Sequence, residues 1–157
     1  MITPAIFTSD KPHSSQPPLV HHHKKADDAL ELAGKRAVIV EDEGITQLQL
    51  SRILRLEGLL VVGTATNGQE AIDVVLATRP DLVLMDIRMP VMDGLEATER
   101  ILAEYRVCIV MLTAFSDEEY RKRAEALETC GYVLKPVTAE TLMPQLKAAF
   151  EKFHFPA

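Results

Sequence analysis

Short apolar runs alternate with longer amphipathic segments along most of this chain, beginning near residue 35. The apolar runs predict five strands, at residues 37–40, 59–65, 82–86, 107–112 and 132–134. The longer segments have apolar residues three and four positions apart and predict five helices, at residues 44–57, 67–78, 93–104, 116–127 and 138–153. Regular alternation of this kind is typical of a parallel sheet with crossover helices, so we predict an α/β, doubly wound fold.

Capping signals mark where several of these helices begin. Asn67, Asp93 and Ser116 are each followed three residues later by Glu, which is the spacing of a capping box. We expect the side chain of each of these residues to accept a backbone N–H, and Glu96 to reach back toward Asp93.

The apolar residues also predict which helix faces are buried. In the first helix Leu50, Ile53 and Leu54 form a stripe that leaves Ile45 and Leu48 partly outside it. The fourth helix has a thin apolar stripe on an otherwise charged cylinder, so it should be the most exposed of the set. In the last helix a proline falls in the second turn, and we expect a bend there rather than a break.

The first 34 residues differ from the rest of the chain in composition. Proline, serine, threonine and histidine are common there, and such a mixture buries too little apolar surface to offset the entropy of ordering. We predict a disordered leader at residues 1–34, with a short helix at 24–32, and one domain at residues 35–155.

Composition excludes several classes of protein. The net charge of −6 argues against direct nucleic-acid binding, which requires a basic face, whereas the 47% of hydrophobic residues suffices for a core. No apolar run reaches membrane-spanning length, and the N-terminus lacks a secretory signal. Cys108 and Cys130 have no metal-binding spacing, so we interpret them as buried free thiols in a reducing compartment. These features predict a cytoplasmic protein without a membrane partner.

Polar residues follow four of the five predicted strands. Glu41 and Asp42 follow the first strand, Asp86 ends the third, and Thr113 and Lys135 follow the fourth and fifth. The strand order 2-1-3-4-5 would make these four strands neighbours and would bring their ends together. Clustered carboxylates bind hard cations such as Mg²⁺, while a lysine and a hydroxyl can hold phosphate oxygens. A carboxylate between them is placed to become an acyl phosphate.

Four motifs carry these residues: 38–42 (VIVED), 84–94 (LMDIRMPVMDG), 112–114 (LTA) and 131–136 (GYVLKP). In this order they resemble the receiver domain of two-component response regulators, the CheY-like family, over about residues 35–153. The resemblance implies a flavodoxin-like three-layer sandwich with a parallel five-stranded sheet. It also implies a protein that is not a conventional enzyme but catalyses its own phosphorylation and dephosphorylation.

The resemblance assigns roles to the acidic residues. Asp86 would accept a phosphoryl group from a histidine kinase or a histidine phosphotransfer protein. Asp42, Asp86 and the backbone carbonyl of Arg88 would hold Mg²⁺, with Glu41 acting through water.

The resemblance likewise assigns roles to the remaining polar and aromatic residues. Thr113 and Lys135 would hold the phosphoryl oxygens, and Tyr132 would be the aromatic switch that moves with Thr113. The Lys135-Pro136 bond would be cis. Arg88 and Phe115 would flank the line of water attack, so we expect their bulk to slow hydrolysis of the phosphorylated aspartate.

Interaction surfaces are predicted in the same way. Because the sequence ends shortly after the last helix, we expect a stand-alone receiver whose unknown output protein binds in trans. The face of the fourth helix, fifth strand and fifth helix, including Phe115, Arg121 and Arg123, would meet that protein. Exposed Ile45 and Leu48 would dock the phosphodonor. Whether the chain forms a homodimer is left open.

The sequence also allows several alternative functions to be compared. A haloacid-dehalogenase-type phosphatase needs a second Asp where Arg88 stands, and a flavodoxin-like electron carrier needs a phosphate loop where the acidic residues 41–43 stand. A non-phosphorylated interaction module would have an eroded acidic pocket. The sequence does not separate an output switch from a shuttle that passes phosphate to a histidine phosphotransfer domain.

Overall fold

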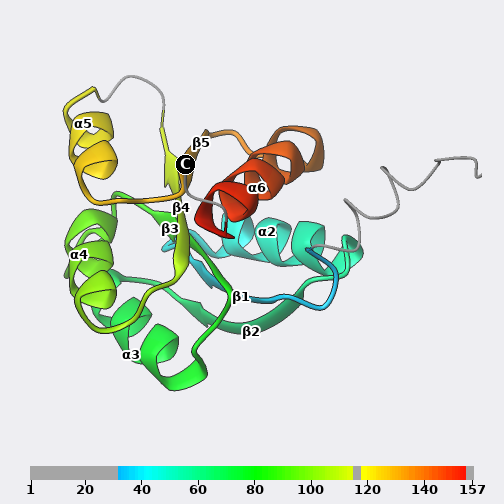
Figure 1. Ribbon diagram of the computed structural model, residues 1–157, viewed down its shortest axis with the longest axis horizontal. Helices are drawn as coiled ribbons and strands as arrows, with labels where there is room; N and C mark the ends of the chain where they lie inside the picture. The colour runs from blue at the N-terminus through cyan, green and yellow to red at the C-terminus, as the bar shows by residue number, and fades with distance from the viewer. Residues whose placement is uncertain (1–31, 115–117, 155–157) are drawn as a thin grey trace, which may run out of the picture.

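The predicted apolar runs form a five-stranded parallel sheet in the computed structural model, which describes residues 32–114 and 118–154 (Figure 1). The strands are β1 (Arg36–Val40), β2 (Leu60–Ala65), β3 (Leu82–Asp86), β4 (Cys108–Thr113) and β5 (Gly131–Leu134). They are arranged in the order β2-β1-β3-β4-β5, as predicted. All four neighbouring pairs are parallel, so the carboxyl ends of the strands meet at one edge.

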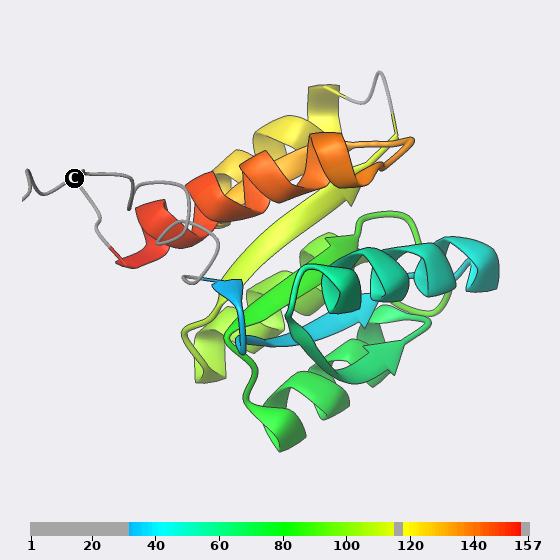
Figure 2. The same ribbon diagram turned by 90° about the vertical axis from the view of Figure 1, so that its right-hand side faces the viewer.

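Helices cover both faces of this sheet. They are α2 (Gly44–Leu56), α3 (Gly68–Thr78), α4 (Gly94–Glu104), α5 (Glu118–Ala126) and α6 (Ala139–His154). Figures 1 and 2 show α2 and α6 on one face and α3, α4 and α5 on the other. The fold is therefore the predicted three-layer sandwich.

Strand β3 lies at the centre of the hydrophobic core. All of its residues are buried, because helices cover both of its faces. Leu82 and Leu84 belong to the core beneath α2 and α6, whereas Val83 and Met85 belong to the core beneath α3, α4 and α5. This alternation explains why the strand reads as an unbroken apolar run.

The predicted caps at Asn67 and Asp93 are confirmed, but the contact predicted for Glu96 is not. The side chains of Asn67 and Asp93 accept the backbone N–H groups of Glu70 and Glu96 at 2.9 and 2.8 Å. The predicted return contact from Glu96 is wrong, because its carboxylate instead accepts from Arg100 at 2.7 Å, one helical turn away. The prediction for residue 116 lies outside the described residues.

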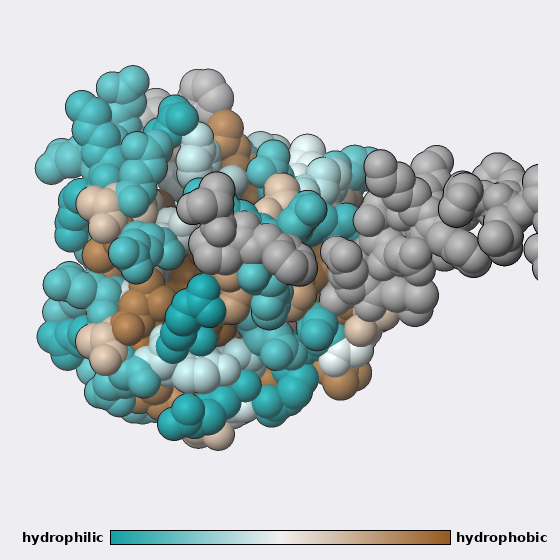
Figure 3. Space-filling model, in the orientation of Figure 1, coloured by the Kyte–Doolittle hydropathy of each residue, from teal (hydrophilic) through white to brown (hydrophobic). Residues whose placement is uncertain are grey.

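Burial of the helix faces follows the predicted stripes. Leu50 and Leu54 are buried in α2 and Ile53 is half-buried, while Ile45 and Leu48 are 69% and 71% exposed. In α5 only Ala124 is buried, and Figure 3 shows hydrophilic side chains over this helix. Helix α6 continues through its internal proline without a break.

The ends of the chain are described only in part. The predicted leader and short helix lie outside the described residues except for residues 32–34, where the Leu32 side chain is buried in the core. The prediction that both cysteines are buried is wrong for Cys130, which is half-buried because it lies in the loop before β5, while Cys108 inside β4 is buried. Among the described residues no helix is long and apolar enough to cross a membrane.

Candidate functional site

The carboxyl edge of the sheet forms a cleft of about 580 Å³. Nine of the residues that line it come from the ends of β1, β3, β4 and β5, and Tyr120 comes from α5: Glu41, Asp42, Glu43, Asp86, Ile87, Arg88, Thr113, Ala114, Tyr120 and Lys135. The cleft therefore contains each of the acidic residues, the threonine and the lysine that the sequence places at strand ends.

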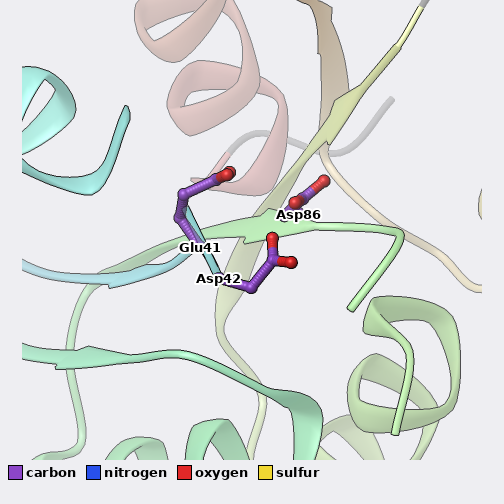
Figure 4. A group of neighbouring side chains, drawn as sticks. All are labelled: Glu41, Asp42 and Asp86. Carbon is purple, nitrogen blue, oxygen red and sulfur yellow. The ribbon is translucent and has the colours of Figure 1, made fainter. Parts of the chain in front are cut away.

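Three carboxylates meet inside this cleft. Glu41 and Asp42 follow β1, Asp86 ends β3, and one oxygen of each lies within 4.8 Å of the others (Figure 4). Glu41 and Asp86 are 1% and 6% exposed, whereas Asp42 is open to solvent. Oxygen donors from two or three carboxylates with access to water fit Mg²⁺, which retains several of its waters when it binds to proteins.

Lys135 supplies the opposing charge. Its Nζ lies 2.9 Å from Glu41 Oε2 and 3.2 Å from Asp86 Oδ2, so one ammonium group bridges two of the three carboxylates. Burial alone would lower the pKa of Lys135, but the hydrogen bond to Glu41 and the charge of Asp86 raise it above its ordinary value. The lysine is therefore charged, and this one cationic group faces three acidic groups.

Asp86 is the acidic group whose titration is most altered. Burial and the charge of Glu41 raise its pKa to about 7, although Lys135 lowers it in part. Near neutral pH the cation-free protein therefore holds Asp86 protonated in a large fraction of molecules. A divalent cation in the cleft would favour the ionised, nucleophilic form.

Close backbone packing fixes the end of β3. The Gly94 N–H donates to the Ile87 carbonyl at 2.7 Å, and a Cβ at Gly94 would collide with the backbone carbonyl of Asp86. The Gly68 N–H donates to the Met92 carbonyl at 2.9 Å. The loop that follows Asp86 is thus folded back and held against both the strand end and α3.

Sequence reasoning missed Gln47, which supports the first acidic residue. Its Nε2 donates to the carbonyls of Glu41 and Ala65, at 3.1 Å each, and so joins the ends of β1 and β2. The sequence did contain a signal for this role. Gln47 is a polar residue that precedes Leu50 by three positions and Leu54 by seven, so it lies on the stripe that α2 turns toward the sheet.

The remaining predicted residues lie around the cleft. The Thr113 hydroxyl donates to the Ala114 carbonyl at 3.1 Å, and the backbone N–H of Lys135 donates to the Thr113 carbonyl at 2.8 Å. Arg88 and Tyr120 both line the cleft, and the Arg88 guanidinium lies 5.1 Å from the centre of the Tyr120 ring. The predicted cis bond is present at Lys135-Pro136.

Tyr132 lies in β5, outside the cleft. It is paired in register with Met111, two residues before Thr113, so the side chains of Thr113 and Tyr132 point to the same face of the sheet. Its ring is half-buried against the core beneath α5, and the Arg121 guanidinium lies 5.0 Å from the ring centre. Phe115 lies outside the described residues.

Comparison with known proteins identifies related chains. A family model described as the response regulator receiver domain matches residues 37–147. The chain is 37% identical over 126 residues to the transcriptional regulatory protein PdtaR of Mycobacterium tuberculosis, covering 80% of this chain and 62% of that protein. It is 43% identical over 112 residues to the transcriptional regulatory protein LnrK of Bacillus subtilis, covering 69% of this chain and 50% of that protein. The chain thus spans less than two thirds of the length of either relative.

Solved structures agree with this result. The signal receiver domain of a modulated diguanylate cyclase from Desulfovibrio desulfuricans G20 matches with a TM-score of 0.71 and 33% identity, over 77% of this chain and 97% of that chain. A two-component response regulator of the LuxR family from Aurantimonas sp. SI85-9A1 matches with a TM-score of 0.69 and 28% identity, over 75% and 86%.

Proposed function

The chain belongs to the response regulator receiver domain family, and from this premise we propose that Asp86 accepts a phosphoryl group from a histidine kinase or a histidine phosphotransfer protein. The observation that carries the proposal is the position of Asp86, which is almost fully buried, lies beside two further carboxylates, and has the Lys135 ammonium 3.2 Å from its Oδ2. A lone capping aspartate needs neither the acidic neighbours nor the cation.

Asp42, Asp86 and the backbone carbonyl of Arg88 would hold Mg²⁺ in this proposal, with Glu41 acting through water. When bound, Mg²⁺ neutralises charge on the carboxylates and on the incoming phosphoryl oxygens. An Asp86 carboxylate oxygen attacks phosphorus, and the bond from phosphorus to the donor's imidazole nitrogen breaks. The nitrogen keeps the electron pair, and Asp86 becomes an acyl phosphate.

Lys135 and Thr113 would stabilise the transferred group. The Lys135 ammonium already lies beside Asp86 Oδ2, so it can pair with a phosphoryl oxygen on the same side chain after transfer. The Thr113 hydroxyl can exchange its bond to the Ala114 carbonyl for a bond to a second phosphoryl oxygen.

Arg88 and Phe115 would slow hydrolysis by shielding the acyl phosphate, so Phe115→Ala should shorten the lifetime of the phosphorylated protein. An unchanged dephosphorylation rate would refute that role.

Movement of Thr113 would carry the signal outward. Tyr132 shares its face of the sheet, and the face formed by α5, β5 and α6, including Arg121 and Arg123, would change with the two residues. We propose this face as the surface for the output partner. Affinity capture with and without beryllofluoride, which mimics the acyl phosphate, should reveal a partner retained only in its presence.

The acidic cluster also bears on the alternatives. A non-phosphorylated interaction module has no need of three clustered carboxylates, two of which pair with a half-buried lysine amine, so this cluster favours phosphoryl acceptance. Transfer onward to a histidine phosphotransfer domain would use the same Asp86 chemistry in reverse.

Intact-mass measurement tests the proposal directly. The protein is incubated with Mg²⁺ and acetyl phosphate, and the expected result is one added phosphoryl group on the wild type and none on Asp86→Asn. Asp93→Asn is the matched control, because Asp93 caps α4 outside the cleft and Asn is an equally good cap. A wild type that stays unmodified, or an Asp86→Asn variant that is modified equally, would overturn the assignment.

A further inference from the structure

A second cleft lies near the amino-terminal ends of β4 and β5, whereas Asp86 lies at the carboxyl end of β3. It has a volume of about 490 Å³, and its walls include Leu102, Arg106, Cys130, Lys152 and Phe153, none of which lines the first cleft. Strand β4 begins beside it at Cys108 and ends at Thr113 in the first cleft. In Figure 2 the strand arrowheads point to the right, and the C-terminal end of α6 lies at the left.

Two thiols meet in this region. Cys130 lines the cleft and is half-buried, whereas Cys108 lies behind it and is fully buried. Cys130 packs against the core cluster that contains Cys108, each thiol shifts the pKa of the other, and neither is in a disulfide. The Cys130 N–H donates to the carbonyl of Ile109 at 3.0 Å, so the loop that carries Cys130 is fastened beside Cys108. One thiol is therefore accessible from the cleft, and the other lies close to it but is shielded.

Basic side chains surround the accessible thiol. Arg106 is held in place, since its Nη2 donates to the Phe153 carbonyl at 3.1 Å and its guanidinium lies 4.2 Å from the centre of the Phe153 ring. The hydrogen bond from Cys108 lowers the pKa of the Cys130 thiol, burial raises it, and the charges of Lys152 and Arg106 lower it further, with a net lowering. Glu125 and Glu128 line the same cleft.

The buried thiol titrates in the opposite direction. The hydrogen bond to Cys130 and burial both raise the pKa of Cys108, so Cys108 keeps its proton and donates it. An accessible thiol with a lowered pKa beside a shielded thiol is an arrangement that favours reaction with oxidants. A purely structural pair in the core needs neither the cleft nor the basic side chains.

We propose that Cys130 and Cys108 form an oxidant-sensitive dithiol whose substrate is a small hydroperoxide admitted by the second cleft. The Cys130 thiolate attacks one peroxide oxygen, the O–O bond breaks, and the leaving oxygen takes a proton from solvent. Cys130 is oxidised by two electrons to a sulfenic acid, and the peroxide is reduced. The Cys108 sulfur then attacks the Cys130 sulfur, the S–O bond breaks, and the departing hydroxide leaves as water with the Cys108 proton. The product is an intramolecular disulfide.

Hydrogen peroxide tests this proposal on the full chain. The protein is oxidised, denatured, alkylated with N-ethylmaleimide and analysed by intact mass and peptide mapping. We expect both thiols of the monomer to become resistant to alkylation together and to be recovered as one cross-linked peptide pair. Cross-links only between two chains, or oxidation no faster than in the denatured protein, would overturn the proposal.

Two variants separate the roles of the thiols. In Cys108→Ser the sulfenic acid on Cys130 should persist and be captured by dimedone. In Cys130→Ser, Cys108 should be oxidised about tenfold more slowly than Cys130 is in the wild type, because it is shielded and protonated. Equal reactivity of the two single cysteines would contradict these roles. Should either variant fail to fold, mapping of the first thiol alkylated in the native wild type distinguishes the same two roles, with Cys130 expected first and Cys108 first overturning the assignment.

The basic side chains provide a further check. Lys152→Gln should slow alkylation of Cys130 about threefold near neutral pH, because the thiolate loses a nearby positive charge. Lys122→Gln is the matched control, since Lys122 is exposed on α5 and does not line the second cleft. Equal rates in the two variants would show that Lys152 does not activate the thiol and would count against the proposal.

Discussion

Asp86 shows how the surroundings of a single residue change its chemistry. An aspartate in water is ionised at neutral pH, yet burial and Glu41 raise the pKa of Asp86 to about 7. Its charge is therefore unfavourable in the folded protein unless a cation accompanies it. The same feature that prepares the residue to bind a cation lowers the stability of the cation-free fold.

A stability measurement tests this conclusion. The folded-state pKa of Asp86, about 7, lies above the ordinary value of 3.8, so its contribution to stability is greatest below the lower value and falls as pH rises toward 7. Without divalent cations, Asp86→Asn should melt higher than the wild type by about 5 °C at about pH 8, and by much less at about pH 4. A thermal-unfolding difference that is the same at both pH values would contradict this expectation.

The cation itself should reverse the order of stability. Adding Mg²⁺ in excess of its dissociation constant should raise the melting temperature of the wild type by several degrees, because the ion binds the folded state only. Asp42→Asn and Asp86→Asn should lose most of this gain, since each removes a carboxylate from the cluster. Thermal unfolding with Mg²⁺ and with a chelator makes the comparison, and an equal gain in all three proteins would place the ion elsewhere.

At the scale of elements, the return loop after β3 depends on one glycine. In Gly94→Ala the new Cβ would meet the backbone of Asp86, which cannot move aside as a flexible side chain would, so we expect a loss of about 3 kcal/mol in the free energy of unfolding. Denaturant titration measures the loss. Gly44→Ala is the control, because nothing lies within 4 Å of a Cβ there, and equal effects of the two substitutions would refute the explanation.

Helix α2 offers a test of the donor-docking surface. Leu48→Asp should reduce phosphotransfer from the cognate kinase about tenfold or more, because a charge replaces an exposed apolar contact. Phosphorylation by acetyl phosphate should be unchanged, since the cleft is untouched. Leu56→Asp on the same helix, 76% exposed near its other end, is the matched control. Kinase transfer that survives Leu48→Asp would remove Leu48 from the docking surface.

Sequence pattern was sufficient to predict the elements and their order, for identifiable reasons. The β3 run is apolar throughout because it is covered on both faces, and the polar residues at the ends of β1, β3, β4 and β5 favour an order in which these four strands lie side by side. Contacts that depend on side-chain conformation were not predictable. Glu96 turned to Arg100 rather than to the helix start, and Gln47 joined two strand ends that the chain places far apart.

The whole molecule has two chemically distinct edges joined by β4. One edge gathers carboxylates and a lysine, and the other gathers two thiols and two basic side chains. The first was visible in the sequence because its residues lie at strand ends. The second was not, because Cys130, Arg106 and Lys152 belong to separate loops and a helix end whose meeting depends on how α6 packs.

The shallow attachment of α5 has a consequence for the dynamics of the molecule. Only Ala124 of this helix is buried, whereas α6 buries five residues, so local unfolding of α5 should cost far less free energy than opening of the core. In native-state hydrogen exchange its backbone amides should therefore acquire deuterium well before those of β3 or α6. A segment that already opens so readily is one that a modest chemical event elsewhere in the molecule can re-order.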